Sequence, residues 1–91
     1  MEALYKRELY GETMALAIEA KGSTAVSIAN RWALGWPDRV RALLAAGVYG
    51  ECLERQTETE KDALAETYAP HLSTIEVLQL NEVSLYPPFL G

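Results

Sequence analysis

Glycine and proline divide this 91-residue chain into short segments, and each segment carries apolar residues at helical spacing. Gly22, Gly35 and Gly47 end the first three segments, and Pro70 ends the fourth. Within the segments, apolar side chains recur every three or four residues, which is typical of amphipathic helices. No segment alternates with a period of two for long enough to predict a strand, although residues 77–85 are ambiguous. We therefore predict an all-α fold, a compact bundle of four to five short helices.

Capping residues and prolines indicate where these helices begin and end. We expect helices at residues 2–20, 24–34, 37–46, 50–68 and 74–80. Ser23 and Thr24 are suitable N-caps for the second helix, and Pro37 suits the first turn of the third. Ser73, followed three residues later by Glu76, forms the capping-box pattern that predicts the last helix.

The size and cysteine content of the chain favour one small domain in a reducing compartment. We expect residues 1–84 to form a single helical domain and residues 85–91 a proline- and aromatic-rich tail that packs back on it. Cys52 is the only cysteine, which excludes an internal disulfide and indicates a cytoplasmic location. We expect neither a secretion signal nor a membrane-spanning helix. Because so short a chain buries a thin core, a homo-oligomer remains an alternative.

The residues that support catalysis or metal binding in other proteins are few here and far apart. Cys52 and His71 form the only Cys–His pair, and we expect a buried structural cysteine and a surface histidine. One cysteine and one histidine are too few for a typical zinc site. The chain also lacks a glycine-rich phosphate loop. We therefore expect a protein that is not an enzyme and that uses no metal and no cofactor.

A helix-turn-helix around Gly35 would make the chain a small DNA-binding regulator, which is one alternative function. That motif needs a small residue before the turn and a branched apolar residue after it, where this chain has Arg31 and Arg41. Moving the frame to Ala29 places Arg39 at the position that should be buried. The three arginines would contact phosphates in this alternative, but the net charge of −5 opposes binding to nucleic acid.

The strongest functional signal is a row of acidic residues on the predicted fourth helix. The residues that make up this row are Glu51, Glu54, Glu58, Asp62 and Glu66. The last four recur every four residues and therefore share one helix face, where each like-charge pair opposes the helix by about 0.2–0.5 kcal/mol. One interpretation is a solvated surface, and the other is a face that binds a basic surface on a protein partner. We take these five residues as the candidate partner-binding site.

Glu60 and Gln56 fall on the opposite, inward face of the same helix. A buried carboxylate needs a hydrogen-bonding or ionic partner, because removing its charge from water is costly. We expect Arg31, Arg39 or a tryptophan N–H to provide that partner within the chain. An oligomer or partner interface is the alternative.

Trp32 and Trp36 flank Gly35 and are predicted to hold the second and third helices together. They are also the candidate aromatic anchor of a binding surface. The stretch of residues 31–40 resembles small uncharacterised proteins encoded by bacteriophages and prophages, which carry a similar tryptophan-glycine-tryptophan-proline segment and then a Gln/Glu-rich helix. The resemblance covers about residues 24–80 and implies no activity and no site residues.

What the resemblance does imply is a context, because small acidic helical phage proteins often bind and block a host protein, CRISPR effectors included. The leading hypothesis is a non-catalytic, acidic protein-binding module, a phage-encoded inhibitor of a host protein that acts in the host cytoplasm. The alternatives are the DNA-binding regulator and a structural or assembly subunit that works as a homo-oligomer.

Overall fold

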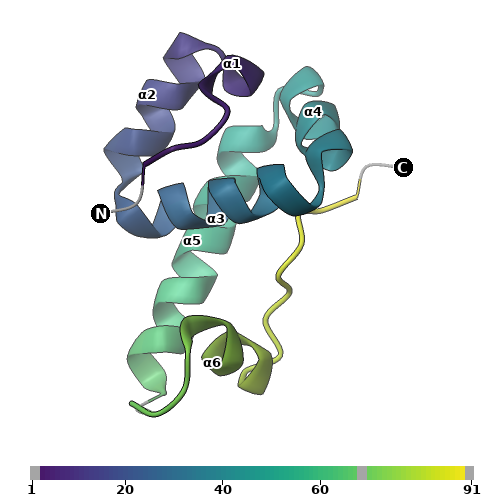
Figure 1. Ribbon diagram of the computed structural model, residues 1–91. Helices are drawn as coiled ribbons and strands as arrows, with labels where there is room; N and C mark the ends of the chain where they lie inside the picture. Colours follow the sequence, from purple (N-terminus) through teal and green to yellow (C-terminus); the bar gives the residue numbers. More distant parts are fainter. Residues whose placement is uncertain (1–2, 68–69, 90–91) are drawn as a thin grey trace.

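The structure, a computed structural model, describes residues 3–67 and 70–89 and contains six helices (Figure 1). These helices are α1 (Arg7–Tyr10), α2 (Glu12–Lys21), α3 (Ser23–Gly35), α4 (Pro37–Ala45), α5 (Tyr49–Glu66) and α6 (Thr74–Leu80). The described part of the chain contains no strand, so the predicted all-α fold is confirmed. None of the helices within it is long and apolar enough to cross a membrane.

Most of the predicted helices lie within one or two residues of the observed ones. The last helix agrees at both ends, and its capping box is formed: Glu76 N donates to Ser73 Oγ at 3.2 Å, and Ser73 N donates to Glu76 Oε1 at 3.1 Å. Pro37 opens α4 as expected. The predicted end of the fourth helix at Tyr68 lies outside the described residues.

The prediction of one continuous first helix is wrong, because the chain breaks at Gly11. Gly11 has φ +83° and ends α1 just before α2 begins, a conformation that glycine adopts without steric cost. The segment before α1 is not helical, because Asn30 of α3 binds its backbone. Tyr5 N donates to Asn30 Oδ1 at 2.8 Å, and Asn30 Nδ2 donates to the carbonyl of Ala3 at 2.8 Å. This break makes six helices where four to five were expected, and it turns Tyr10 into the core.

The predicted N-caps of α3 are also wrong. The helix begins at Ser23 itself, with Gly22 as the N-cap and no side-chain hydrogen bond to the first turn. Gly22 has φ +107°, and its carbonyl accepts the first backbone bond of the helix from Val26 N at 3.2 Å. The side chains of Ser23 and Thr24 therefore do not cap the helix and lie at the surface of α3.

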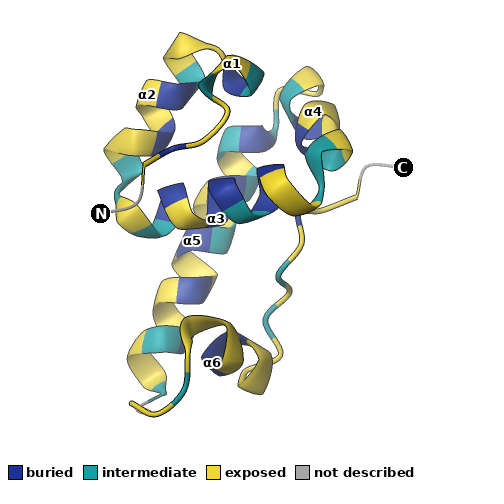
Figure 2. Cartoon of the chain, in the orientation of Figure 1, coloured by how far each residue is buried: buried dark blue, intermediate teal, exposed yellow. Residues whose placement is uncertain are grey.

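Helix α3 is the centre of the fold. It packs against α2 on one side, against α4 at its end and across α5 (Figure 1). Its inner face supplies fully buried Ile28, Ala29 and Trp32. Buried positions recur along α3 in dark blue in Figure 2. The Trp32 ring meets the ring of Tyr49 of α5 edge-on, with centroids 6.1 Å apart. Burial raises the pKa of Tyr49 far above its ordinary value, so its hydroxyl stays neutral in the core.

Helix α6 and the following residues form the second part of the body. Val77 and Leu78 are buried where α6 packs on the C-terminal half of α5. After α6 the chain runs back in extended form toward α4 (Figure 1), and Pro87 is fully buried there. The expectation that the tail packs on the body is confirmed for residues 85–89. Residues 90 and 91 lie outside the described residues.

Replacing Gly11 by alanine should lower the free energy of unfolding by about 1–2 kcal/mol, because a side chain is strained at positive φ. Space is not the cause, since a Cβ at this position meets no heavy atom within 4 Å. Gly35→Ala is the matched control: Gly35 is helical and equally open, so the change should stabilise the protein by about 0.4–1 kcal/mol. Urea denaturation measures the free energy of unfolding of both variants. Equal effects of the two substitutions would contradict a glycine-dependent break.

Candidate functional site

The five predicted partner-binding residues lie together on the outer surface of α5. We call them the acidic face: Glu51, Glu54, Glu58, Asp62 and Glu66, all exposed. Leu53, Thr57 and Glu60 of the same helix are buried on the opposite side. At about 1.5 Å of rise per residue, the acidic face extends for roughly 22 Å along the helix axis. The helix thus separates a continuous carboxylate surface from the core.

The negative charge of the acidic face is hardly neutralised within the chain. Glu54 Oε2 lies 4.0 Å from Lys21 Nζ, an exposed pair of little energetic weight. The other four carboxylates make no ion pair with any described residue. Lys61 and Arg55 lie on the same helix without pairing with them. The acidic face therefore presents a negative electrostatic potential to the solvent.

Glu60 has its partner inside the chain, as predicted. Its side chain is only 3% exposed and pairs with Arg31 of α3, Nη2 to Oε2 at 2.5 Å and Nη1 to Oε1 at 3.3 Å. Gln56 Nε2 adds a third hydrogen bond, to Oε2 at 2.7 Å. The two parallel bonds from one guanidinium fix the geometry of both side chains. Of the expected partners, Arg31 is the one that binds Glu60.

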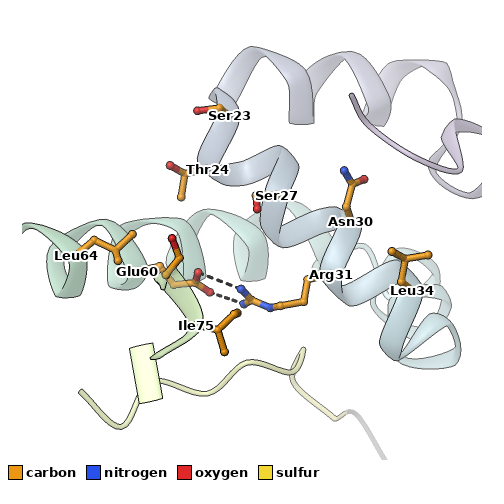
Figure 3. Close-up of a pocket in the computed structure, with 10 residues that line it drawn as sticks. Ser23, Thr24, Ser27, Asn30, Arg31, Leu34, Glu60, Leu64 and Ile75 are labelled. Atoms are coloured by element: carbon orange, nitrogen blue, oxygen red, sulfur yellow. Dashed lines mark hydrogen bonds and ion pairs between the residues drawn. The ribbon is translucent and has the colours of Figure 1, made fainter. Parts of the chain in front are cut away.

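A groove of about 560 Å³ between α3, α5 and α6 contains this ion pair (Figure 3). The residues that line it are Ser23, Thr24, Ser27, Asn30, Arg31, Leu34, Glu60, Leu64, Thr74 and Ile75. Because Arg31 and Glu60 neutralise each other, the groove presents hydroxyls and apolar side chains rather than net charge. Sequence reasoning missed the groove because three helices form it. The one feature of the sequence that indicates the groove is the spacing of its α3 residues, which places them on one face of the helix: Thr24, Ser27, Arg31 and Leu34.

The two tryptophans on either side of Gly35 lie in different environments. Trp32 is fully buried, and its Nε1 has no hydrogen-bond partner among the described residues. A ring without solvent-exposed area cannot contact a partner protein, so the prediction of Trp32 as an aromatic anchor for a partner is wrong. Trp36 is half-buried, and its ring lies 6.1 Å from the ring of Tyr86 in the tail. Trp36 alone keeps an exposed edge.

The arginines that a DNA-binding regulator would use are engaged within the chain. Arg31 is tied to Glu60, and Arg39 Nη1 donates to the carbonyl of Pro87 at 3.3 Å. Arg41 is exposed but pairs with Asp38 at 2.9 Å. The three guanidinium groups thus have different partners and do not form a common basic surface.

The remaining candidate residues are not brought together. Cys52 is half-buried at the edge of the core, although a buried residue was expected, and His71 is exposed in the connection before α6. The part of the chain that the structure describes contains no group of three or more His, Cys, Asp and Glu side chains that could hold a metal ion.

Comparison of the chain with protein-family models, with curated proteins and with solved structures found no match.

Proposed function

We propose that the chain is a non-catalytic protein-binding module whose acidic face binds a basic surface on a partner protein. The observation that carries this proposal is the exposed row of five carboxylates along α5, of which Glu54 alone lies within ion-pair distance of a described base. A surface of one sign steers an oppositely charged partner and speeds its encounter.

The like-charge repulsion within the acidic face supports a role for this face in binding. Glu54, Glu58, Asp62 and Glu66 follow one another at four-residue spacing, so each neighbouring pair is repulsive. Among the described residues, Lys21 is the one base within ion-pair distance of the row, and Arg55 and Lys61 on the same helix relieve the repulsion only in part. A partner that brings lysine or arginine side chains to α5 would remove the repulsion and gain new ion pairs.

The shape of the face suits a concave, basic site. A single convex helix that projects a row of carboxylates can enter a groove lined by lysine and arginine, as nucleic-acid-binding proteins have. Together with the resemblance to phage and prophage proteins, this chemistry extends the proposal to a phage-encoded inhibitor. Its target would be a nucleic-acid-binding host effector in the host cytoplasm, for example a CRISPR effector.

Reversing two charges on the acidic face, with Glu58→Lys and Asp62→Lys, should weaken partner binding without unfolding the protein. Both side chains are exposed, and the change relieves like-charge repulsion along α5, so the melting temperature should not fall. Binding should weaken mainly through a slower on-rate, and wild-type binding should weaken as salt rises. The measurement is affinity capture from the source cells with quantitative comparison of the two baits, followed by binding kinetics with the purified partner.

The matched control reverses two exposed carboxylates elsewhere that make no ion pair with a described residue, with Glu8→Lys and Glu82→Lys. It changes the net charge by the same amount but leaves α5 intact. The proposal requires a partner that the control variant binds as the wild type does and that the α5 variant binds clearly more weakly. If both variants retain the partner, or both lose it while folded, the acidic face is not the binding surface.

A further inference from the structure

Side chains of the helices bind the extended tail through its main-chain carbonyls. Gln56 Nε2 donates to the carbonyl of Ser84 at 2.7 Å, and Arg31 Nε donates to that of Leu85 at 2.9 Å. Arg39 Nη1 donates to the carbonyl of Pro87 at 3.3 Å. No backbone hydrogen bond joins residues 84–89 to the helices within the described chain. The tail is therefore held as a bound peptide is held, by groups of the surface beneath it.

Rings and a proline complete this contact. Pro87 is fully buried, while Tyr86 packs against the ring of Trp36 with centroids 6.1 Å apart. The guanidinium carbon of Arg39 lies 5.5 Å from the centroid of Tyr86 and 5.1 Å from that of Phe89. Cation–π contacts of this kind stabilise aromatic rings over an arginine. The surface thus has a place for a proline and a cationic platform for the aromatic residues on either side of it.

Two of the donors are positioned independently of the tail. The buried carboxylate of Glu60 accepts hydrogen bonds from both Arg31 and Gln56, and each of them also donates to a tail carbonyl. Holding donors in place before a ligand arrives lowers the entropic cost of binding. Glu60 is therefore a positioning residue, because it holds both donors through contacts that do not involve residues 84–89.

We propose that Arg31, Gln56, Trp36 and Arg39 form a binding site for an extended, proline-containing peptide with flanking aromatic residues, and that a partner's segment of this chemistry binds there by displacing residues 84–89. Proline-rich segments suit such a site because they are already extended and their prolines have no N–H to satisfy. We call the four residues the tail site. It is independent of the acidic face and of the function proposed for it.

Competition decides which occupant the tail site takes. The tail follows α6 directly, so its effective concentration at the site is on the order of millimolar. The tail of a second copy would make the same contacts without this advantage, so exchange between copies is disfavoured. A partner's segment displaces the tail only if it binds more tightly, through additional contacts.

The test opens the site in the full-length chain with Tyr86→Ala and Pro87→Ala. The probe is a synthetic peptide with the sequence of residues 83–89, Val-Ser-Leu-Tyr-Pro-Pro-Phe. Calorimetry should show saturable binding to the opened variant and at least about tenfold weaker binding to the wild type, whose own tail competes. Arg39→Ala added to the opened variant should abolish binding, as should replacing both prolines of the peptide by alanine.

Three results would overturn the proposal of the tail site. A folded opened variant that does not bind the peptide overturns the proposal, and so does binding that Arg39→Ala leaves unchanged. If the opened variant does not fold, the same peptide is titrated into the wild-type chain, with a fluorine label on the indole of Trp36. The fluorine NMR signal of Trp36 should shift as the peptide concentration reaches about 1–5 mM, where the peptide competes with the tail. An unshifted Trp36 signal over that range overturns the proposal as well.

Discussion

Replacing Trp32 by alanine is expected to remove a large part of the stability of the protein. The ring is fully buried and contacts Tyr49 edge-on in the middle of the core. Truncating a buried tryptophan to alanine costs about 3–5 kcal/mol, because apolar contacts are lost and a cavity remains. The whole stability of a small domain is only about 5–15 kcal/mol. Urea denaturation followed by far-UV circular dichroism should show a midpoint at a much lower urea concentration than that of the wild type.

Two other tryptophan substitutions test the reason for this result. Trp32→Phe should cost clearly less than Trp32→Ala, because it keeps an aromatic ring and removes an N–H that has no described partner. Trp36→Ala should also cost less, since Trp36 is half-buried and contacts the tail rather than the core. A Trp36→Ala variant as unstable as Trp32→Ala would show that the tail, and not α3, is the main support of the fold.

Replacing Arg31 by methionine should lower the free energy of unfolding by about 3–5 kcal/mol, because it leaves the carboxylate of Glu60 buried without its cation. Gln56 alone cannot supply the opposite charge. The double variant Arg31→Met/Glu60→Leu should recover to within about 1–2 kcal/mol of the wild type, since two apolar residues then replace the pair. The residual loss corresponds to the hydrogen bond from Arg31 to the carbonyl of Leu85.

Urea denaturation of the wild type, both single variants and the double variant gives the coupling between Arg31 and Glu60 directly. Arg41→Met is the matched control, because its pair with Asp38 is exposed and should be worth less than about 1 kcal/mol. If Arg31→Met behaved like Arg41→Met, the pair of Arg31 and Glu60 would be solvated, and Glu60 would not position the donors of the tail site.

The sequence by itself determined the helices from α3 onward to within one or two residues, and the exposed surface of α5. The starts of α4 and α6 follow from Pro37 and from the Ser73–Glu76 capping box, which act within a few residues. The exposure of Glu58 and Asp62 follows from helical periodicity, because Leu53 and Thr57 occupy the opposite face. Such features depend on local geometry and on the cost of burying charge, and both can be judged from neighbouring residues.

Only the tertiary structure decided which distant groups meet. Glycine at position 11 permits either a helix or a break, and the segment before α1 stays out of the helix because Asn30 binds its backbone. The sequence left three candidate partners for Glu60, and the crossing of α3 over α5 selects Arg31. The same crossing, with Trp36 and Arg39 at the end of α3 and the start of α4, creates the surface on which the tail lies. These contacts join residues 25 to 54 positions apart, and such pairings depend on how the helices pack rather than on any local pattern.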